Sequence, residues 1–295
     1  MIVIHNPQAG VLRRLLAGSE FLTLPGVYDA LTAKIAAKVG FKCLVMGGYS
    51  IAASRLGQPD VGYLTMTEMT QALKNICDAV DLPIVADGDT GYGNALSVRR
   101  TVVEYERAGA AAMLFEDQVW PKRCGHMQGK EVIPTEEHAA KIRAAVEART
   151  NPDTLIIART DSRAVYDMPE AIKRGHAYFD AGADALFIEA PQDEAELRAI
   201  AQAFPGKILL ANMLEGGKTP ILNAAQLQEI GFRIVFWPCT ALYTVFKSLE
   251  EVFAELNNTG TTAGVAAKMH SFQQFNELVG LSEYAALEKQ YCKKE

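Results

Sequence analysis

The 295-residue sequence predicts a (β/α)8 barrel with a helical extension at its C-terminal end. Three observations lead to this fold class: short runs of branched apolar residues, helical periodicity between them, and glycine just ahead of several runs. Short, nearly continuous apolar runs are typical of parallel strands that helices cover on the outside. A doubly wound open sheet is the alternative, but eight strands at intervals of roughly 20 to 40 residues favour the closed barrel.

The expected strands are spread along most of the chain. They comprise residues 22–24, 43–46, 83–86, 112–115, 155–158, 185–188, 208–211 and 233–237. Between them, residues 65–68 have the form of a capping box that begins a helix, and helical periodicity runs through 143–146 and 171–179. Four glycines precede strands where a helix end needs a residue that tolerates positive φ: Gly40, Gly109, Gly182 and Gly231. No linker or change of composition divides the chain, so we expect one domain over residues 1–295, with a helical tail at about 243–292.

Composition excludes several classes of protein. Lysine and arginine number 29 against 35 aspartates and glutamates, and a formal charge of −6 without a basic run argues against nucleic-acid binding. No stretch of about eighteen apolar residues is available to span a membrane. The first residues lack the pattern of a signal peptide, and five scattered cysteines without a C-x-x-C pair indicate reduced thiols. We therefore expect a cytoplasmic protein.

Polar residues follow five consecutive expected strands. They are Asp87-Gly88-Asp89, Glu116-Asp117, Arg159-Thr160-Asp161, Glu189 and Asn212. The loops after the strands form the active face of such a barrel, so we expect these side chains to converge on one site. Each of them taken alone is as well explained as a loop cap or a surface ion pair.

Three of these acids predict a metal site. Asp87, Asp89 and Glu116 would repel one another without a cation, and oxygen ligands without His or Cys suit Mg²⁺ or Mn²⁺. We expect Asp87 to bind the ion directly and the other two to act through water. Arg159 offers a planar fork for a substrate carboxylate, and the Gly47-Gly48-Tyr49 segment can present backbone amides to one. No P-loop or dinucleotide fingerprint is present, so no nucleotide-type cofactor is indicated.

One cysteine stands out from the other four. Cys124 lies between Lys122-Arg123 and His126, and this positive surrounding predicts a favoured thiolate. Gly125 lets the chain bend and approach a ligand. An inert surface thiol is the alternative for Cys124, and packing or inert roles are expected for the remaining cysteines. The other histidines are expected at the surface; they are His5, His138, His176 and His270.

Several segments together resemble the isocitrate lyase/phosphoenolpyruvate mutase superfamily. They are KRCGH at 122–126, DGDTGYG at 87–93, GQPD at 57–60 and ARTD at 158–161. The similarity covers nearly the whole chain and is greatest to the short bacterial branch, which includes lyases of 2-methylisocitrate and 2,3-dimethylmalate and a carboxyphosphonoenolpyruvate mutase. It implies a barrel whose last helix is exchanged between subunits, in a homotetramer built as a dimer of dimers.

The resemblance also implies a role for each motif residue. Asp87 would bind Mg²⁺, with Asp89 and Glu116 in its outer sphere. Cys124 would be the general acid/base on a mobile gating loop. The other expected catalytic residues are Asp60, Lys122 and Arg159, and the other substrate-binding residues are Gly47, Gly48, Tyr49, Gly125, His126, Glu189 and Asn212, again with Arg159.

Four positions bear on the substrate. Methylisocitrate lyases of this pattern carry late arginines for a third carboxylate, where this sequence has Tyr243 and Phe275. A buried carboxylate without its cation costs several kcal/mol, which argues against a tricarboxylate. Gly47 replaces a frequent Ser or Thr, and Pro238 favours a carbon–carbon lyase over an oxaloacetate hydrolase.

We therefore expect a lyase that splits an alkylmalate-type acid into pyruvate and a short carboxylic acid. The alternatives are a 2-methylisocitrate lyase, a phosphonate P–C mutase and, from another class, a non-catalytic barrel subunit.

Overall fold

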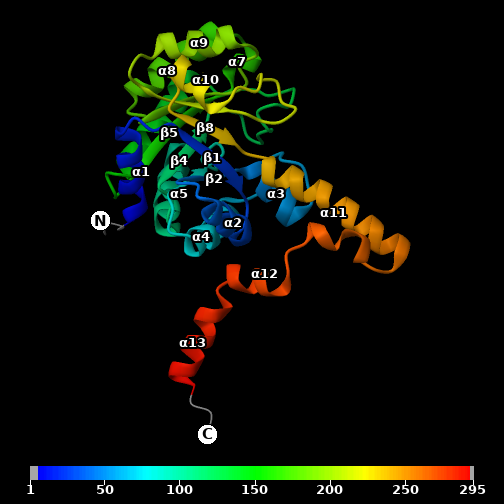
Figure 1. Ribbon diagram of the computed structural model, residues 1–295. Helices are drawn as coiled ribbons and strands as arrows, with labels where there is room; N and C mark the ends of the chain where they lie inside the picture. Colours follow the sequence, from blue (N-terminus) through cyan, green and yellow to red (C-terminus); the bar gives the residue numbers. More distant parts are fainter. Residues whose placement is uncertain (1–5, 293–295) are drawn as a thin grey trace. The chain divides into compact units, whose positions relative to one another are not determined.

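Eight parallel strands close into a barrel in the computed structural model, which describes residues 6–292 (Figure 1). In chain order they are β1 (Leu22–Val27), β2 (Leu44–Met46), β3 (Ile84–Asp87), β4 (Ala112–Glu116), β5 (Leu155–Thr160), β6 (Ala185–Ile188), β7 (Ile208–Asn212) and β8 (Ile234–Trp237). Each strand pairs with the next, and β8 pairs with β1, with Leu22 opposite Ile234. The closed barrel is confirmed, and the open doubly wound sheet is excluded.

The first strand is longer than the sequence predicts. Proline and glycine usually end a strand, so the expectation stopped at residue 24. The structure continues β1 through Pro25 and Gly26, and Gly26 pairs with Val45 of β2. A Cβ on Gly26 would overlap the carbonyl of Pro238, so only glycine lets the two backbones approach this closely.

Helices surround the strands on the outside of the barrel (Figure 1). They are α1 (Pro7–Ala17), α2 (Ala30–Val39), α3 (Gly48–Leu56), α4 (Met66–Ala79), α5 (Ala95–Ala108), α6 (Thr135–Ala148), α7 (Ser162–Val165), α8 (Met168–Asp180), α9 (Glu194–Ala203) and α10 (Ala224–Ile230). The expected capping box is present at the start of α4, where the Thr65 and Glu68 side chains each accept the other's backbone N–H. The four glycines expected at helix ends all have positive φ, between 100° and 120°.

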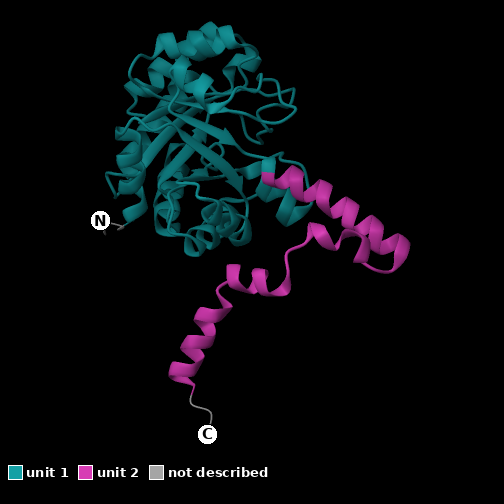
Figure 2. Cartoon of the chain, viewed as in Figure 1, with its two compact units in different colours: residues 1–240 teal, residues 241–295 magenta. Residues whose placement is uncertain are grey.

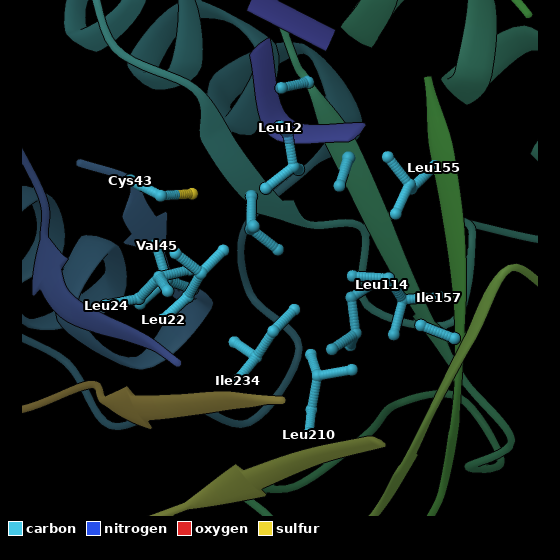
Figure 3. Close-up of a cluster of buried hydrophobic side chains, with 14 of the residues drawn as sticks. Leu12, Leu22, Leu24, Cys43, Val45, Leu114, Leu155, Ile157, Leu210 and Ile234 are labelled. Atoms are coloured by element: carbon cyan, nitrogen blue, oxygen red, sulfur yellow. The ribbon is translucent and has the colours of Figure 1, made fainter. Parts of the chain in front are cut away.

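The barrel interior is filled with apolar side chains (Figure 3). Leu24, Leu114, Ile157 and Leu210 come from different strands and are at most 4% exposed. Leu12 of α1 belongs to the same cluster, which ties this helix to the barrel. Each fully buried side chain of this size stabilises the fold by about 1.5–3 kcal/mol. This packing leaves the carboxyl ends of the strands free to carry polar groups.

The chain forms two compact units, Met1–Thr240 and Ala241–Glu295 (Figure 2). The tail is helical, as expected, with α11 (Thr240–Thr259), a short 3₁₀ segment η1 (Ala263–Lys268), α12 (Phe272–Leu278) and α13 (Leu281–Tyr291). Among residues 240–291, none in these helices is buried, and Phe246 and Phe253 are about 60% exposed (63% and 59%). Within residues 6–292, no helix is long and apolar enough to cross a membrane.

Candidate active site

A small cavity lies where the strands end, and most of the expected site residues line it. They are Gly47, Gly48, Tyr49, Asp60, Asp87, Lys122, Cys124, Gly125, His126, Arg159, Glu189 and Asn212, joined by Leu214, Pro238 and Cys239. Asp89 and Glu116 stand behind this lining, in contact with Lys122 and Arg159 respectively. The structure therefore brings every residue that the sequence placed in the site into one connected group.

The carboxylate of Asp87 is held in place by backbone amides. Gly48 N donates to Asp87 Oδ2 at 2.9 Å, and Asp89 N donates to Oδ1 at 3.0 Å. The backbone amide of Gly48, which was expected to bind the substrate, therefore donates to Asp87 instead. Asp89 itself has a left-handed φ of 47°, and the Tyr92 hydroxyl donates to its Oδ2 at 3.0 Å. No motif in the sequence indicates this role of Tyr92.

Lys122 links the loop after β4 to the acids near β3. Its Nζ lies 2.8 Å from Asp60 Oδ2 and 2.7 Å from Asp89 Oδ1, and all three side chains are buried. Burial disfavours the ammonium, but the two carboxylates raise its pKa well above the usual value. Burial in turn raises the pKa of Asp89 to about 6, against the opposing effect of Lys122.

Arg159 is surrounded by three carboxylates. Its Nη1 lies 3.2 Å from Glu116 Oε2, its Nε 2.9 Å from Asp161 Oδ2, and its Nη2 3.1 Å from Glu189 Oε2. The guanidinium expected to hold a substrate carboxylate is thus paired within the protein. The contact between Arg159 and Glu116 is an ion pair without hydrogen-bond geometry, and within residues 6–292 neither Glu116 oxygen accepts a hydrogen bond. Burial raises the pKa of Glu116 well above its usual range.

The surroundings of the Cys124 thiol favour its protonated form, contrary to the thiolate that the sequence predicted. Burial raises its pKa to about 11, and the nearby carboxylates of Glu189 and Asp60 add to this effect. The neighbouring cations do not offset it, because Lys122 pairs with carboxylates and Arg123 is exposed. The prediction failed because burial and the nearby carboxylates outweigh the basic neighbours in sequence.

Gly125 and His126 bring the loop onto the pair formed by Arg159 and Glu189. A Cβ on Gly125 would overlap Glu189 Oε2 and lie 2.5 Å from Arg159 Nη2, so the backbone itself covers the ion pair. His126 Nδ1 accepts from Lys218 N at 3.0 Å, which assigns the proton to Nε2, 3.3 Å from Glu189 Oε1. Asn212 Nδ2 lies 3.4 Å from the same oxygen.

The remaining histidines and cysteines differ partly from expectation. His138 is fully buried against the Tyr178 ring, with ring centroids 4.6 Å apart, and burial lowers its pKa to about 3; the expected surface position is wrong. His176 and His270 are exposed, and His5 lies outside the described residues. All five cysteines lie among the described residues, and none of them forms a disulfide.

The loop that carries Cys124 has a closed base. An isolated antiparallel bridge joins Gln118 to Val132, and Val119 N donates to Glu131 O at 2.9 Å. Gln118 and Lys130 are buried side chains that reach the loop backbone, and sequence reasoning assigned neither of them to the site.

Comparison with known proteins agrees with this geometry. Residues 12–257 match the family model for phosphoenolpyruvate phosphomutase. The chain is 47% identical to 2,3-dimethylmalate lyase of Eubacterium barkeri, over 96% of this chain and 98% of that one. It is 44% identical to the chloroplastic carboxyvinyl-carboxyphosphonate phosphorylmutase of Arabidopsis thaliana (97% and 86%), and 40% identical to 2-methylisocitrate lyase of Aeropyrum pernix (96% and 91%).

Solved structures show the same relationship. A crystal structure of 2,3-dimethylmalate lyase matches with a TM-score of 0.91 at 38% identity, covering 99% of this chain and 96% of that one. Phosphonopyruvate hydrolase in complex with oxalate and Mg²⁺ matches with a TM-score of 0.87 at 32% identity, covering 97% and 99%. This chain belongs to the phosphoenolpyruvate phosphomutase family, within the PEP mutase/isocitrate lyase superfamily.

Proposed function

We propose that this chain is a Mg²⁺-dependent carbon–carbon lyase that splits 2,3-dimethylmalate, or a similar alkylmalate, into pyruvate and a short carboxylic acid. The observation that carries the proposal is the 47% identity to 2,3-dimethylmalate lyase over nearly the full length of both chains. The cavity supports it, because it combines a protonated thiol with buried carboxylates and cations at the carboxyl ends of the strands.

The reaction requires one bond to break and one proton to reach carbon. In 2,3-dimethylmalate the C2–C3 bond breaks, and its electron pair delocalises into the adjacent C4 carboxylate. The C2 hydroxyl loses its proton and becomes the ketone of pyruvate. C3 then takes a proton and leaves as propionate. Cys124 suits this last task, because a thiol with a pKa of about 11 holds its proton at neutral pH.

The carboxylates fit a hard divalent cation. Glu116 Oε1 is buried and, in the part of the chain that the structure describes, accepts no hydrogen bond, while Glu116 Oε2 and Asp89 Oδ1 are buried and meet only the cations Arg159 and Lys122. No three His, Cys, Asp or Glu side chains among residues 6–292 are grouped to chelate one ion together. This favours Asp87 as the direct ligand, with water carrying the contacts to Asp89 and Glu116, as Mg²⁺ prefers. When bound, the ion would stabilise negative charge on the oxygens of the 2-oxo acid half.

The leaving half is best matched by a small, apolar acid. Tyr243 and Phe275 stand where resemblance places the arginines for a third carboxylate. A second candidate is a phosphonate P–C mutase, which the 44% identity to carboxyvinyl-carboxyphosphonate phosphorylmutase favours. Both candidates use the same cavity, so substrate turnover must separate them.

We propose further that the second unit mediates assembly with another copy of the chain, through helix exchange in a tetramer. The exposed aromatic residues of α11 and α12 support this, since Phe246 and Phe272 are 63% and 85% exposed within the chain. The cytoplasmic location stays a prediction from cysteine usage.

The test is pyruvate release from a substrate panel in the presence of Mg²⁺. The panel comprises 2,3-dimethylmalate, other alkylmalates, 2-methylisocitrate, oxaloacetate and phosphonopyruvate. We expect fast release from an alkylmalate that EDTA abolishes and Cys124→Ser nearly abolishes, with 2-methylisocitrate turned over poorly. Conversion of phosphonopyruvate to phosphoenolpyruvate without pyruvate release, with every malate inert, would establish the mutase candidate instead. No turnover of any compound, together with no Mg²⁺ binding, would favour the non-catalytic barrel.

A further inference from the structure

Two buried polar side chains form hydrogen bonds with the backbone on either side of Cys124. We propose that Gln118 and Lys130 are positioning residues that fix this backbone and thereby aim the Cys124 thiol into the cavity. The catalytic consequence rests on the proposed lyase function, whereas the positioning itself can be measured without turnover.

Gln118 holds the residue that precedes the cysteine. Its Oε1 accepts from Arg123 N at 3.0 Å, and its Nε2 donates to Arg123 O at 2.9 Å. The side-chain amide thus pairs with both polar groups of one residue, as a neighbouring strand would. Gln118 is only 1% exposed, so loss of these bonds would leave buried polar groups unpaired.

Lys130 holds the residue that follows the cysteine. Its Nζ donates to Gly125 O and forms an ion pair with Asp161 Oδ1 at 2.7 Å. Asp161 is fixed in turn, because it also pairs with Arg159 and its backbone N donates to Asp117 Oδ1 at 2.9 Å. Lys130 therefore connects a loop carbonyl to the end of β5.

The two contacts leave the cysteine itself little freedom. Cys124 N donates to Asp60 O at 3.3 Å, and Met127 N donates to Cys124 O at 2.9 Å. With Arg123 and Gly125 anchored on either side, the direction of the Cys124 side chain is set by Gln118 and by the contact of Lys130 with Asp161 at the end of β5. A proton donor must stay within hydrogen-bond reach of its acceptor, so this direction matters for turnover.

The test compares Gln118→Met and Lys130→Met with two further variants. Lys130→Arg keeps a cation and its donors, and Lys173→Met removes an exposed lysine on α8 as the matched control. We expect each Met variant at positions 118 and 130 to lower kcat by about ten- to a hundredfold, with a much smaller change in KM. Lys130→Arg should recover most of the loss, and Lys173→Met should match the wild type.

The second readout is alkylation of Cys124 by iodoacetamide, followed peptide by peptide by mass spectrometry. Exposed Cys292 in the same digest is the internal standard. We expect alkylation of Cys124 to quicken at least about tenfold in both Met variants, because a released loop exposes a thiol that is otherwise partly covered. A stable variant with quickened alkylation supports the proposal even if the wild type splits no malate, in which case only the proposed function fails. Alkylation at the wild-type rate in both Met variants would overturn the proposal, whatever happens to kcat.

Discussion

One added methyl group at Gly125 should lower turnover strongly while the fold stays intact. In Gly125→Ala, the new Cβ would lie 2.5 Å from Arg159 Nη2, whereas ordinary contacts begin at about 3.4 Å. Arg159 cannot retreat, because carboxylates hold the guanidinium at each of its nitrogens. The loop must therefore shift by about 1 Å, a displacement that can cost about a hundredfold in rate, or about 2.7 kcal/mol.

The assay is kcat/KM for pyruvate release from 2,3-dimethylmalate, with thermal unfolding measured on the same samples. Gly18→Ala is the matched control, because its φ of −73° suits alanine and its Cβ would make only ordinary contacts, the nearest at 3.5 Å. We expect both variants to keep a Tm close to that of the wild type. If Gly125→Ala retained kcat/KM within about threefold of the wild type, the inferred contact between loop and ion pair would not govern catalysis.

Three further changes test two other residues of the site and one buried histidine outside it. Cys124→Ser should lower kcat by about 10²- to 10⁴-fold with an unchanged Tm, and near-normal turnover would exclude the thiol as proton donor. Mg²⁺ at a hundred times its Kd should stabilise the wild type by about 2.7 kcal/mol in thermal unfolding but leave Asp87→Ala unaffected; equal stabilisation of both would place the ion elsewhere. The pKa of His138 is lowered to about 3 in the folded state, so the unfolded chain takes up a proton first as the pH falls below about 6.5, and stability is lost. Between pH 7 and pH 5, the free energy of unfolding measured in urea should therefore fall by about 2 kcal/mol less in His138→Phe than in the wild type. An equal fall in both proteins would contradict this.

The strands could be predicted because their signals are local. Each apolar run stands alone between polar turns, and glycines such as Gly109 and Gly231 mark the preceding helix ends with positive φ. The exception was β1, whose extension through Gly26 depends on the distant Pro238 carbonyl. A contact between residues so far apart in the chain leaves no pattern in a short stretch of sequence.

The sequence predicts which residues form the site, but not which of their charged groups pair with one another. Strand ends and motifs located Asp87, Arg159 and Cys124, yet the protonation of the thiol depends on which charges face it in three dimensions. The roles of Gln118 and Lys130 were missed for a similar reason. A buried glutamine or lysine has no characteristic spacing, and its partner is a backbone group that every residue possesses.

The closed base of the Cys124 loop divides the site into a loop part and a barrel part, and these two parts differ in how readily their residues can be replaced. The bridge between Gln118 and Val132 ends the loop at the barrel, so residues between them can be replaced without altering the register of any strand. Asp87 sits on the other side of that boundary, at the end of β3 in the barrel wall. A segment exchanged between two relatives at these bridge positions would therefore transplant the proton donor together with Lys122, while Asp87 and Arg159 stayed in place. The incoming segment would succeed only if it supplied a cation to pair with Asp60 and Asp89, as Lys122 does.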